Sequence, residues 1–292
     1  MQAALADLLE LLELERLEVN LFRGVSRDIG SPQVFGGQVL GQALRAAYAT
    51  VASGRLAHSL HAYFLQRGDF NAPIVYFVDR SRDGRSFTNR RVTAIQHGEQ
   101  IFHMAASFQP PQPGVEHQLA MPEVPAPETL ADSAALPAET LARLPEEKRR
   151  YYARARAFEF RPTEPLDLLE PRPAPPSQRI WIRAIDRLPD DDELHRCLFA
   201  YVSDFHLLNS ATRPHALSFL STNLIRASID HAMWFHRPVR VDEWMLYDID
   251  SPSASGARGF ARGSVFARDG RLVGSTAQEG LLRVVGKEAT AD

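Results

Sequence analysis

Apolar residues along the chain follow two periods, one typical of helices and one typical of strands. Helical spacing marks residues 1–22, 35–49 and 194–208, and the second segment opens with a Gly pair in "FGGQVLGQALRAAYA". Strand-favouring stretches follow the second and third segments and are separated by the turn signals Asp83-Gly84, His97-Gly98 and Asp269-Gly270. A helix followed by an antiparallel sheet that covers it predicts an α+β unit, with the sheet wrapped around one long helix.

The two halves of the sequence resemble each other. "HAYFLQRG" (61–68) aligns with "HAMWFHRP" (231–238), and "RRVTAIQHGEQIFHMAASF" (90–108) aligns with "ARGSVFARDGRLVGSTAQE" (261–279). Three anchor pairs lie 170, 171 and 172 residues apart, namely His61 with His231, Arg91 with Arg262, and Gly98 with Gly270. We therefore interpret the chain as two copies of one unit of about 110 residues each.

Prolines separate the two copies. Of the 20 prolines, 14 fall between Pro110 and Pro176. Because proline interrupts both helices and strand ladders, we expect this stretch to be mostly a surface connection. The predicted organisation is an N-terminal unit at 1–109, a Pro-rich connection at 110–176, and a C-terminal unit at 177–292 that contains the catalytic residues.

Three polar residues of the second copy stand where the first copy has a different kind of residue. They are Asp204, Ser228 and Gln278, and steps of 170, 170 and 172 residues back pair them with Val34, His58 and Ala106. A packing requirement shared by both copies would not produce this difference. A site that belongs to one copy would produce it.

Each member of this trio suits the activation of water. Asp204 lies in the mostly apolar stretch "FAYVSDFHLL", where a carboxylate is poorly solvated and can act as a general base. The Ser228 hydroxyl can donate to that carboxylate and accept from water. Gln278 can hold a water without titrating, and we expect it to face inward, because its neighbour Glu279 then faces outward. The alternatives are a helix-capping Asp, a strand Ser bonded to backbone and a solvent-exposed Gln.

Other candidates concern substrate binding. Gly37, in the Gly36-Gly37 pair at a helix start, offers free backbone N–H groups to an oxyanion or phosphate. His58 is a candidate wall residue of the site, although a core role is the alternative. The sequence contains no nucleophile elbow, P-loop, CxxC pair or zinc spacing, so we expect no cofactor and no metal.

Composition limits the possible partners and compartment. Hydrophobic residues make up 45% and charged residues 24% of the chain, as in soluble globular proteins, and the net charge is -3. This charge gives no reason to expect nucleic acid as a partner. No apolar run reaches the roughly 18–20 residues that a spanning helix needs, so we expect no membrane insertion. The single cysteine, Cys197, excludes an intrachain disulfide and fits a cytoplasmic location.

Several stretches together resemble the acyl-CoA thioesterase II (TesB-like) family over nearly the whole chain. They are "LFRG" (21–24), "QVFGGQVLGQAL" (33–44), "RDGRSF" (82–87), "IDHAMWFHRP" (229–238), "SGARGFARG" (255–263) and "DGRLVGSTAQEG" (269–280). The resemblance implies a double hotdog fold and metal-free hydrolysis of fatty acyl-CoA to a free fatty acid and CoA. It also implies that the family's catalytic Asp, hydroxyl residue and Gln are Asp204, Ser228 and Gln278.

The chain departs from the family pattern at two places. Position 228 is Ser where Thr is usual, which keeps the hydroxyl but loses rigidity about χ1. Residues 66–69 read "QRGD" where Pro commonly precedes the Gly-Asp, so the fit of the substrate is open at this loop.

Two other functions stay open at this stage. A hotdog enoyl-CoA hydratase would use an Asp–His pair such as Asp230-His231, although adjacent strand residues face opposite ways. A non-catalytic acyl-CoA-binding protein would have lost the polar trio. For each function we expect a homo-oligomer, either a dimer or a tetramer, because exposed sheet edges and backs are usually covered.

Overall fold

The computed structural model describes residues 1–31, 33–133, 136, 138–146, 149, 152, 154–164, 169–218 and 220–285. Its helices are α1 (Ala3–Leu12), α2 (Gly36–Tyr48), α3 (Ala138–Arg143), α5 (Asp192–Ser203) and α6 (Asn209–Thr212), with short 3-10 turns at Pro127–Thr129 and Arg213–His215. Its strands are β1 (Glu15–Glu18), β2 (Leu21–Gly24), β3 (Leu56–Phe64), β4 (Ile74–Asp83), β5 (Thr88–Gln96), β6 (Glu99–Gln109), β7 (Phe158–Pro162), β8 (Ser177–Ala184), β9 (Leu224–Ser228), β10 (Asp230–Phe235), β11 (Met245–Ser255), β12 (Arg258–Ala267) and β13 (Leu272–Val284).

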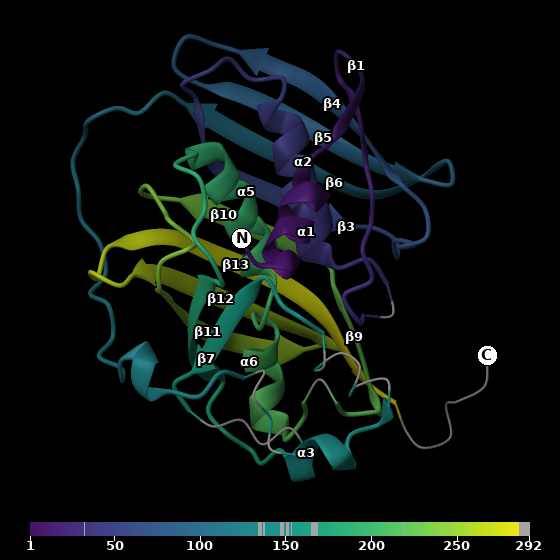
Figure 1. The fold of residues 1–292 in the computed structure, drawn as a ribbon, viewed down its shortest axis with the longest axis vertical. Coiled ribbons are helices and arrows are strands. Elements are labelled where there is room, and N and C mark those ends of the chain that lie inside the picture. Colours follow the sequence, from purple (N-terminus) through teal and green to yellow (C-terminus); the bar gives the residue numbers. More distant parts are fainter. Residues whose placement is uncertain are drawn as a thin grey trace.

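The strands join into one sheet whose two halves have the same strand order when followed outward from the centre (Figure 1). The order is β1-β2-β4-β5-β6-β3-β10-β13-β12-β11-β8-β7, and β9 pairs with β13 beside this path. Strands β3 and β10 form the antiparallel junction at the centre. Read outward from this junction, β3-β6-β5-β4-β2 corresponds to β10-β13-β12-β11-β8. Two copies of one unit, joined through their central strands, therefore form the predicted double hotdog.

The long helices α2 and α5 lie against each other on the inner face of the sheet (Figure 1). Glycines on α2 permit this close approach. A Cβ atom at Gly37 would lie 2.2 Å from the Tyr201 carbonyl oxygen, and one at Gly41 would lie 3.2 Å from the Cys197 carbonyl oxygen. The spacing of four residues puts both glycines on one face of α2, which explains the Gly-rich pattern of this segment.

The structure corrects one of the three anchor pairs in the sequence repeat. Gly98 and Gly270 both adopt a positive φ in equivalent turns, at 82° and 89°. His61, however, points outward and is exposed, whereas His231 points inward and is fully buried. The inward equivalent of His231 is Leu60, 171 residues earlier, because Leu60 also faces the interior of its strand.

The Pro-rich stretch is packed more closely onto the second copy than a surface connection would be. Strand β6 ends at Gln109 and β8 begins at Ser177, and between them β7 pairs with β8. The indole N–H of Trp181 on β8 donates to the Pro125 carbonyl over 2.9 Å. Met121 and Val124 pack against a small apolar cluster that contains Trp181. The connection thus forms part of the wall of the C-terminal copy, and the proposed domain boundaries stay a prediction.

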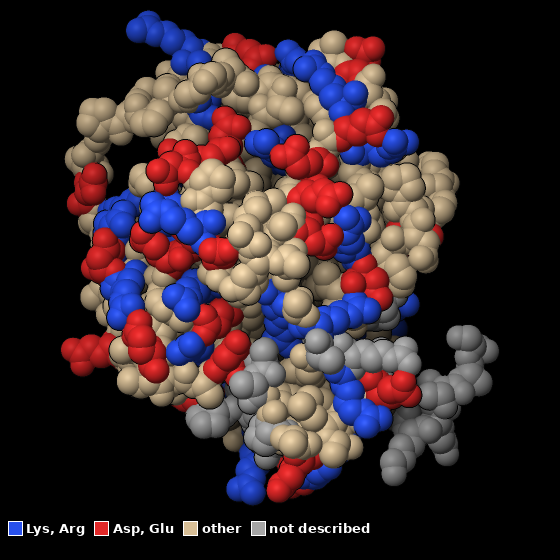
Figure 2. All heavy atoms as spheres, in the orientation of Figure 1, with Lys and Arg blue, Asp and Glu red and all other residues tan. Residues whose placement is uncertain are grey.

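The surface in view mixes both signs of charge. Lys and Arg side chains alternate with Asp and Glu side chains across this face (Figure 2). Many of these groups form exposed ion pairs, such as Arg262 with Asp250 at 2.6 Å and Arg268 with Glu128 at 2.6 Å. Among the helices within the described residues, none is long and apolar enough to cross a membrane.

Candidate active site

The structure brings the three predicted polar residues together. The Gln278 amide nitrogen Nε2 donates to Oδ1 of Asp204 over 2.7 Å, and Ser228 Oγ donates to the same oxygen over 3.4 Å. The three residues come from three elements, since Asp204 caps the end of α5, Ser228 ends β9, and Gln278 lies within β13. Their catalytic roles stay predictions, but the convergence that those roles need is present.

Asp204 is held where α5 ends. The helix begins at the Asp191 cap, whose carboxylate accepts from the backbone N–H groups of Glu193 and Leu194 at 2.9 and 3.1 Å. It ends at Ser203, and two residues after Asp204 the chain adopts a positive φ of 66° at His206, which the helix cannot continue through. Asp204 therefore projects from a defined helix end into the site.

The two oxygens of the Asp204 carboxylate have different surroundings. Both protein donors converge on Oδ1, from Gln278 and Ser228. Oδ2 faces the start of α2, because a Cβ atom placed on Gly36 would lie only 2.7 Å from it. Within the part of the chain that the structure describes, Oδ2 accepts no hydrogen bond. The glycine thus makes room for Oδ2, since any side chain at this position would collide with the carboxylate.

An irregularity between β9 and β10 turns Ser228 toward the site. Ser228 lies opposite Gly280 and Ala232 lies opposite Ala277, so four steps on one strand match three on the other. The extra residue is a β-bulge, and the Asp230 carboxylate accepts the Glu279 backbone N–H there over 2.6 Å. As a result Ser228 faces inward.

Gln278 faces inward, as predicted. Its side chain is 1% exposed, whereas Glu279 points outward and pairs with Arg258 at 2.9 Å. The carbonyl oxygen Oε1 of Gln278 is buried without a hydrogen-bond partner among the described residues. A buried amide oxygen without a partner is costly. A small polar ligand such as water would satisfy it.

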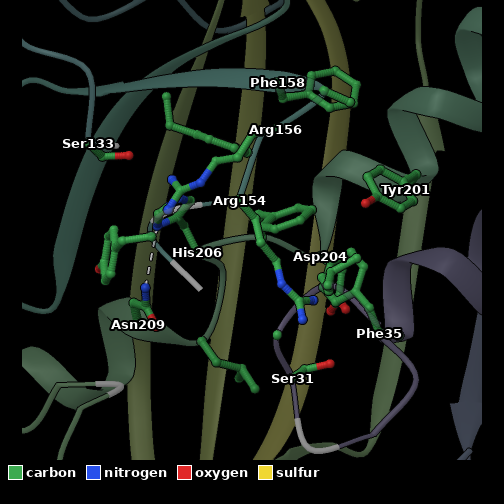
Figure 3. A pocket seen from close by; sticks show the side chains of 18 of the residues that line it. Ser31, Phe35, Ser133, Arg154, Arg156, Phe158, Tyr201, Asp204, His206 and Asn209 are labelled. Atoms are coloured by element: carbon green, nitrogen blue, oxygen red, sulfur yellow. Dashed lines mark hydrogen bonds between the residues drawn. The ribbon is translucent and has the colours of Figure 1, made fainter. Parts of the chain in front are cut away.

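The trio opens into a cavity of about 1110 Å³. Its apolar wall includes an aromatic cluster, in which the Phe205 ring lies 4.3 Å from that of Phe35 and 5.3 Å from that of Phe160, measured between centroids. Tyr201 completes the cluster beside Asp204 (Figure 3). This wall suits an apolar chain placed next to the carboxylate.

Residues of the Pro-rich connection also line the cavity, and sequence reasoning missed them. Phe158 and Phe160 on β7 line the cavity, as do Arg154 and Arg156 just before it. Phe158 and the two arginines are labelled in Figure 3. Arg154 Nη2 bonds the Asp28 carboxylate over 2.8 Å, which ties the connection to the loop before α2. This pairing lowers the pKa of Asp28. In the sequence these cavity residues show only an aromatic pair, Phe158 and Phe160, inside a Pro-rich stretch. Such a pair does not predict which part of the fold it contacts.

Arg67 is a cavity arginine whose guanidinium has no partner among the described residues. Five arginines line the cavity, namely Arg27, Arg67, Arg154, Arg156 and Arg226. Arg27 pairs with Asp7 at 2.9 Å, and Arg154 pairs with Asp28. Arg67 forms no ion pair or side-chain hydrogen bond with any residue that the structure describes. Its loop is nevertheless fixed, because the Gly68 carbonyl accepts from Val34 and the Asp69 N–H donates to Gln96.

The two predicted substrate-binding residues, His58 and Gly37, are not among the residues that line the cavity. His58 Nε2 is 2.8 Å from Ser107 Oγ, and its ring packs edge-on against Phe87, away from the residues that line the cavity. Gly37 packs against the carbonyl of Tyr201. Gly36, one residue earlier, is the glycine that lines the cavity.

Two of the repeat equivalences that pointed to the trio were wrong, although the trio itself assembles. Asp204 caps α5 as Ala49 caps α2, so its equivalent is Ala49 and not Val34. Ser228 pairs with Gly280 as Ala57 pairs with Phe108, so its equivalent is the buried Ala57 and not His58. The equivalence of Gln278 with Ala106 agrees with both facing inward.

The side chains of Asp230 and His231, the pair that the hydratase hypothesis requires, do not meet in one site. The Asp230 carboxylate bonds the Glu279 N–H, while His231 points inward and its Nε2 lies 3.0 Å from Ser203 Oγ. The described residues also contain no group of three or more His, Cys, Asp or Glu side chains placed to hold a metal ion.

Comparison with known proteins identifies the family. The model of the acyl-CoA thioesterase N-terminal domain matches residues 25–109, and the acyl-CoA thioesterase model matches residues 153–281. The chain is 43% identical to acyl-CoA thioesterase 2 of Haemophilus influenzae, over 97% of this chain and 99% of that protein. It is 41% identical to human acyl-coenzyme A thioesterase 8, over 94% and 88%. The crystal structure of acyl-CoA thioesterase II TesB2 from Mycobacterium marinum superposes with a TM-score of 0.76 at 44% identity, covering 95% of this chain and 98% of that one. The chain therefore belongs to the acyl-CoA thioesterase II family.

Proposed function

We propose that Asp204, Ser228 and Gln278 hold the water with which this thioesterase hydrolyses fatty acyl-CoA to free fatty acid and CoA. The observation that supports this proposal most is that only one of the two Asp204 carboxylate oxygens accepts hydrogen bonds from the described residues. Gln278 and Ser228 both bond Oδ1, which leaves Oδ2 beside Gly36 without a donor among the described residues. A general base needs such a free oxygen within reach of the proton that it takes.

The reaction then needs one water and no covalent intermediate. Water donates one hydrogen to the unpartnered Oε1 of Gln278 and gives its other proton to Oδ2 of Asp204 as its oxygen bonds the thioester carbon, while the Ser228 hydroxyl orients the carboxylate through Oδ1. Collapse of the tetrahedral intermediate breaks the C–S bond, and Asp204 returns the proton to the leaving thiolate. Gln278 suits this role because an amide donates to the carboxylate and accepts from water without competing for the proton.

Ser228 as a nucleophile is the less favoured mechanism. A serine nucleophile needs an adjacent base that takes its proton, most often a histidine. Within the described residues no histidine bonds Ser228, and the nearest buried histidine along its strand, His231, bonds Ser203 instead. The Ser228 hydroxyl points to Asp204, which fits a residue that orients water.

The start of α2 is the proposed oxyanion site. The backbone N–H groups of Gly36 and Gly37 belong to the first helical turn and have no acceptor within the described chain. Gly36 lies beside Asp204 Oδ2, so a thioester carbonyl placed there would be close to both the base and these donors. Preorganised donors of this kind typically contribute about 3–4 kcal/mol to the stability of the transition state.

Substrate orientation follows from the aromatic and the cationic side chains that line the cavity. The acyl chain would lie against the aromatic cluster of Phe35, Phe160 and Phe205. The phosphates of CoA need a cation, and Arg67 is a cavity arginine without a protein partner in the described structure. Because this residue stands where the family commonly has Pro, we propose that Arg67 contributes a phosphate contact of this chain's own.

A cytoplasmic location and self-association complete the proposal. A chain with one buried cysteine is suited to a reducing compartment. On the outer face of the central strands, Tyr63 on β3 is 50% exposed and Trp234 on β10 is 36% exposed. Covering such aromatic side chains favours a homo-oligomer, either a dimer or a tetramer.

The test is release of free thiol from a panel of acyl-CoAs of increasing chain length. We expect release by the wild type and its loss in both Asp204→Ala and Gln278→Ala. Undiminished release by both variants would overturn the assignment of the site. Tight acyl-CoA binding without release would indicate a binding protein, and hydration of an enoyl-CoA without thiol release would indicate a hydratase.

A further inference from the structure

The inner faces of the two copies differ at more positions than the trio. On equivalent inward positions, the first copy has Leu60, Val92 and Met104 where the second has His231, Gly263 and Thr276. The three first-copy residues are fully buried and apolar. A shared packing role needs only residues of that kind, so His231, Thr276 and the room left by Gly263 must serve something that the first copy lacks.

A buried tyrosine is present in both copies but bonds different groups. Tyr76 on β4 and Tyr247 on β11 occupy equivalent inward positions, and both are at most 1% exposed. Tyr76 donates to the side chain of Gln42 within α2 over 2.7 Å. Tyr247 instead donates to the backbone carbonyl of Ser203 over 3.0 Å. Only the second tyrosine therefore reaches the end of its helix.

The Ser203 carbonyl is the last one of α5, directly before Asp204. The last carbonyls of a helix have no partner within the helix, and a buried one needs a donor from elsewhere. The phenol of Tyr247 is that donor. Glycine at 263 makes room for it, since a Cβ atom there would lie 2.1 Å from the Tyr247 ring, where the first copy has Val92.

The same phenol links the helix end to the strand of Gln278. Tyr247 Oη lies 2.7 Å from Thr276 Oγ1, and Thr276 is two residues before Gln278 on the same face of β13. Because the phenol hydrogen goes to Ser203, the Thr276 hydroxyl donates to the phenol oxygen. The contacts thus form a closed ring that runs from Ser203 through Tyr247, Thr276 and Gln278 to Asp204.

A second contact fixes Ser203 from its side chain. Ser203 Oγ donates to the Ala200 carbonyl over 2.9 Å, so His231 Nε2, 3.0 Å away, is the donor to Ser203. Burial lowers the pKa of His231, which keeps the imidazole neutral. His231 and Tyr247 therefore hold the residue before Asp204 through its side chain and its backbone respectively.

We propose that Tyr247, assisted by Thr276 and His231, is a positioning residue that sets the Asp204 carboxylate against Gln278. This inference rests on the proposed role of Asp204 and extends it to residues that touch no substrate. Loss of the phenol hydroxyl leaves the Ser203 carbonyl buried without a donor. The end of α5 then relaxes, and Asp204 moves away from the position that Gln278 and the water require.

The test compares Tyr247→Phe with Tyr76→Phe, which removes the equivalent buried hydroxyl from the copy without the trio. We expect both variants to lower the Tm by similar amounts. Tyr247→Phe should lower kcat at least tenfold with KM within twofold, whereas Tyr76→Phe should leave kcat within twofold. Equal kcat for the two variants would overturn the inference.

Two further variants keep the test decisive if Tyr247→Phe does not fold. Thr276→Val removes one contact of the ring, and Ser203→Ala removes the His231 contact but keeps the carbonyl. Each should lower kcat at least threefold at unchanged KM, and unchanged kcat in both would refute the proposal. In a double-mutant cycle, Tyr247→Phe should add less than twofold to the loss caused by Gln278→Ala, whereas a merely structural role would give multiplicative losses.

Asp204→Ala, assayed in parallel, separates the two proposals. If this variant keeps full activity, the proposed function fails. If it loses activity while Tyr247→Phe retains wild-type kcat, only the positioning role fails.

Discussion

The backbone N–H of Glu279 donates to the carboxylate of Asp230 over 2.6 Å, and this contact lies at the bulge that directs Ser228 into the site. In a regular ladder the N–H would bond a backbone carbonyl of the neighbouring strand. Here a side chain takes that place, so the strand gains one residue and its faces exchange. Ser228 and His231 can therefore both face inward although they are three residues apart.

Replacing Asp230 should consequently damage catalysis without touching the trio. Asp230→Ala removes the acceptor of the Glu279 N–H, and we expect kcat to fall about tenfold because Ser228 loses its direction, a change of about 1.4 kcal/mol in the barrier. Asp230→Asn keeps an acceptor oxygen and should retain kcat within threefold. Steady-state kinetics of both variants test this, and equal kcat for Ala and Asn would show that the bulge does not depend on the contact.

The sequence was informative where alternation alone decides the direction of a side chain. Gln278 and Glu279 lie on a regular strand, and the period of two placed Gln278 inward correctly. Ser228 lies next to a bulge, where alternation fails, so its partner in the first copy was mistaken for His58. Asp204 follows a helix whose offset between copies differs from that of the strands, and its equivalence with Val34 failed for this reason.

The contribution of the Pro-rich connection to the cavity could not be predicted, for a different reason. Arg154 meets Asp28 across 126 positions of sequence, and neither residue shows a periodicity or motif that links them. Proline content predicted that 110–176 interrupts the two copies, and these boundaries stay a prediction. It could not show that Phe158 and Phe160 fold back over the second copy, since this depends on tertiary packing.

Ser228 should tolerate a change that keeps its hydroxyl. Ser228→Thr retains the donor to Asp204, so we expect kcat within threefold of the wild type. Ser228→Ala should lower kcat about 30-fold, by about 2 kcal/mol, because the Asp204 carboxylate loses one of the two donors that orient it. Mass spectrometry of enzyme quenched during turnover should detect no acyl group on Ser228. An acyl-serine that forms and decays at the rate of turnover would favour the covalent mechanism.

Arg67 should affect binding of CoA and leave the chemistry unchanged. Arg67→Glu replaces an open cation by an anion, so KM for acyl-CoA should rise about tenfold with kcat within twofold, an effect of about 1.4 kcal/mol. An acyl-pantetheine lacks the nucleotide phosphates and should show no change in KM. Arg85→Glu, at an exposed arginine of the β4–β5 turn, serves as the charge-matched control. If the KM for acyl-pantetheine rises as much as that for acyl-CoA, the phosphate contact is wrong.

His206 should make the fold sensitive to acid. Burial, followed by the charges of Arg156 and Arg226, lowers the pKa of His206 to about 4 from its ordinary value of 6.5. Between these values the unfolded chain binds a proton that the folded chain does not. The free energy of unfolding therefore decreases as the pH falls from 6.5 to 4, by at most about 1.4 kcal/mol per pH unit from this residue.

The pH dependence is measured as Tm against pH for the wild type and for His206→Asn. Asparagine tolerates the positive φ of this position better than other uncharged residues and does not titrate. The variant should show a shallower decrease of Tm below pH 6.5. Parallel curves for the two proteins would mean that His206 titrates normally in the folded state.

The most direct test of the account is a single-turnover measurement on Asp204→Asn. This substitution keeps the shape of the side chain but removes the base, so thiol release should slow at least about 1000-fold while the Kd for acyl-CoA stays within threefold. A wild-type rate of thiol release from Asp204→Asn would contradict the claim that the Asp204 carboxylate activates the attacking water.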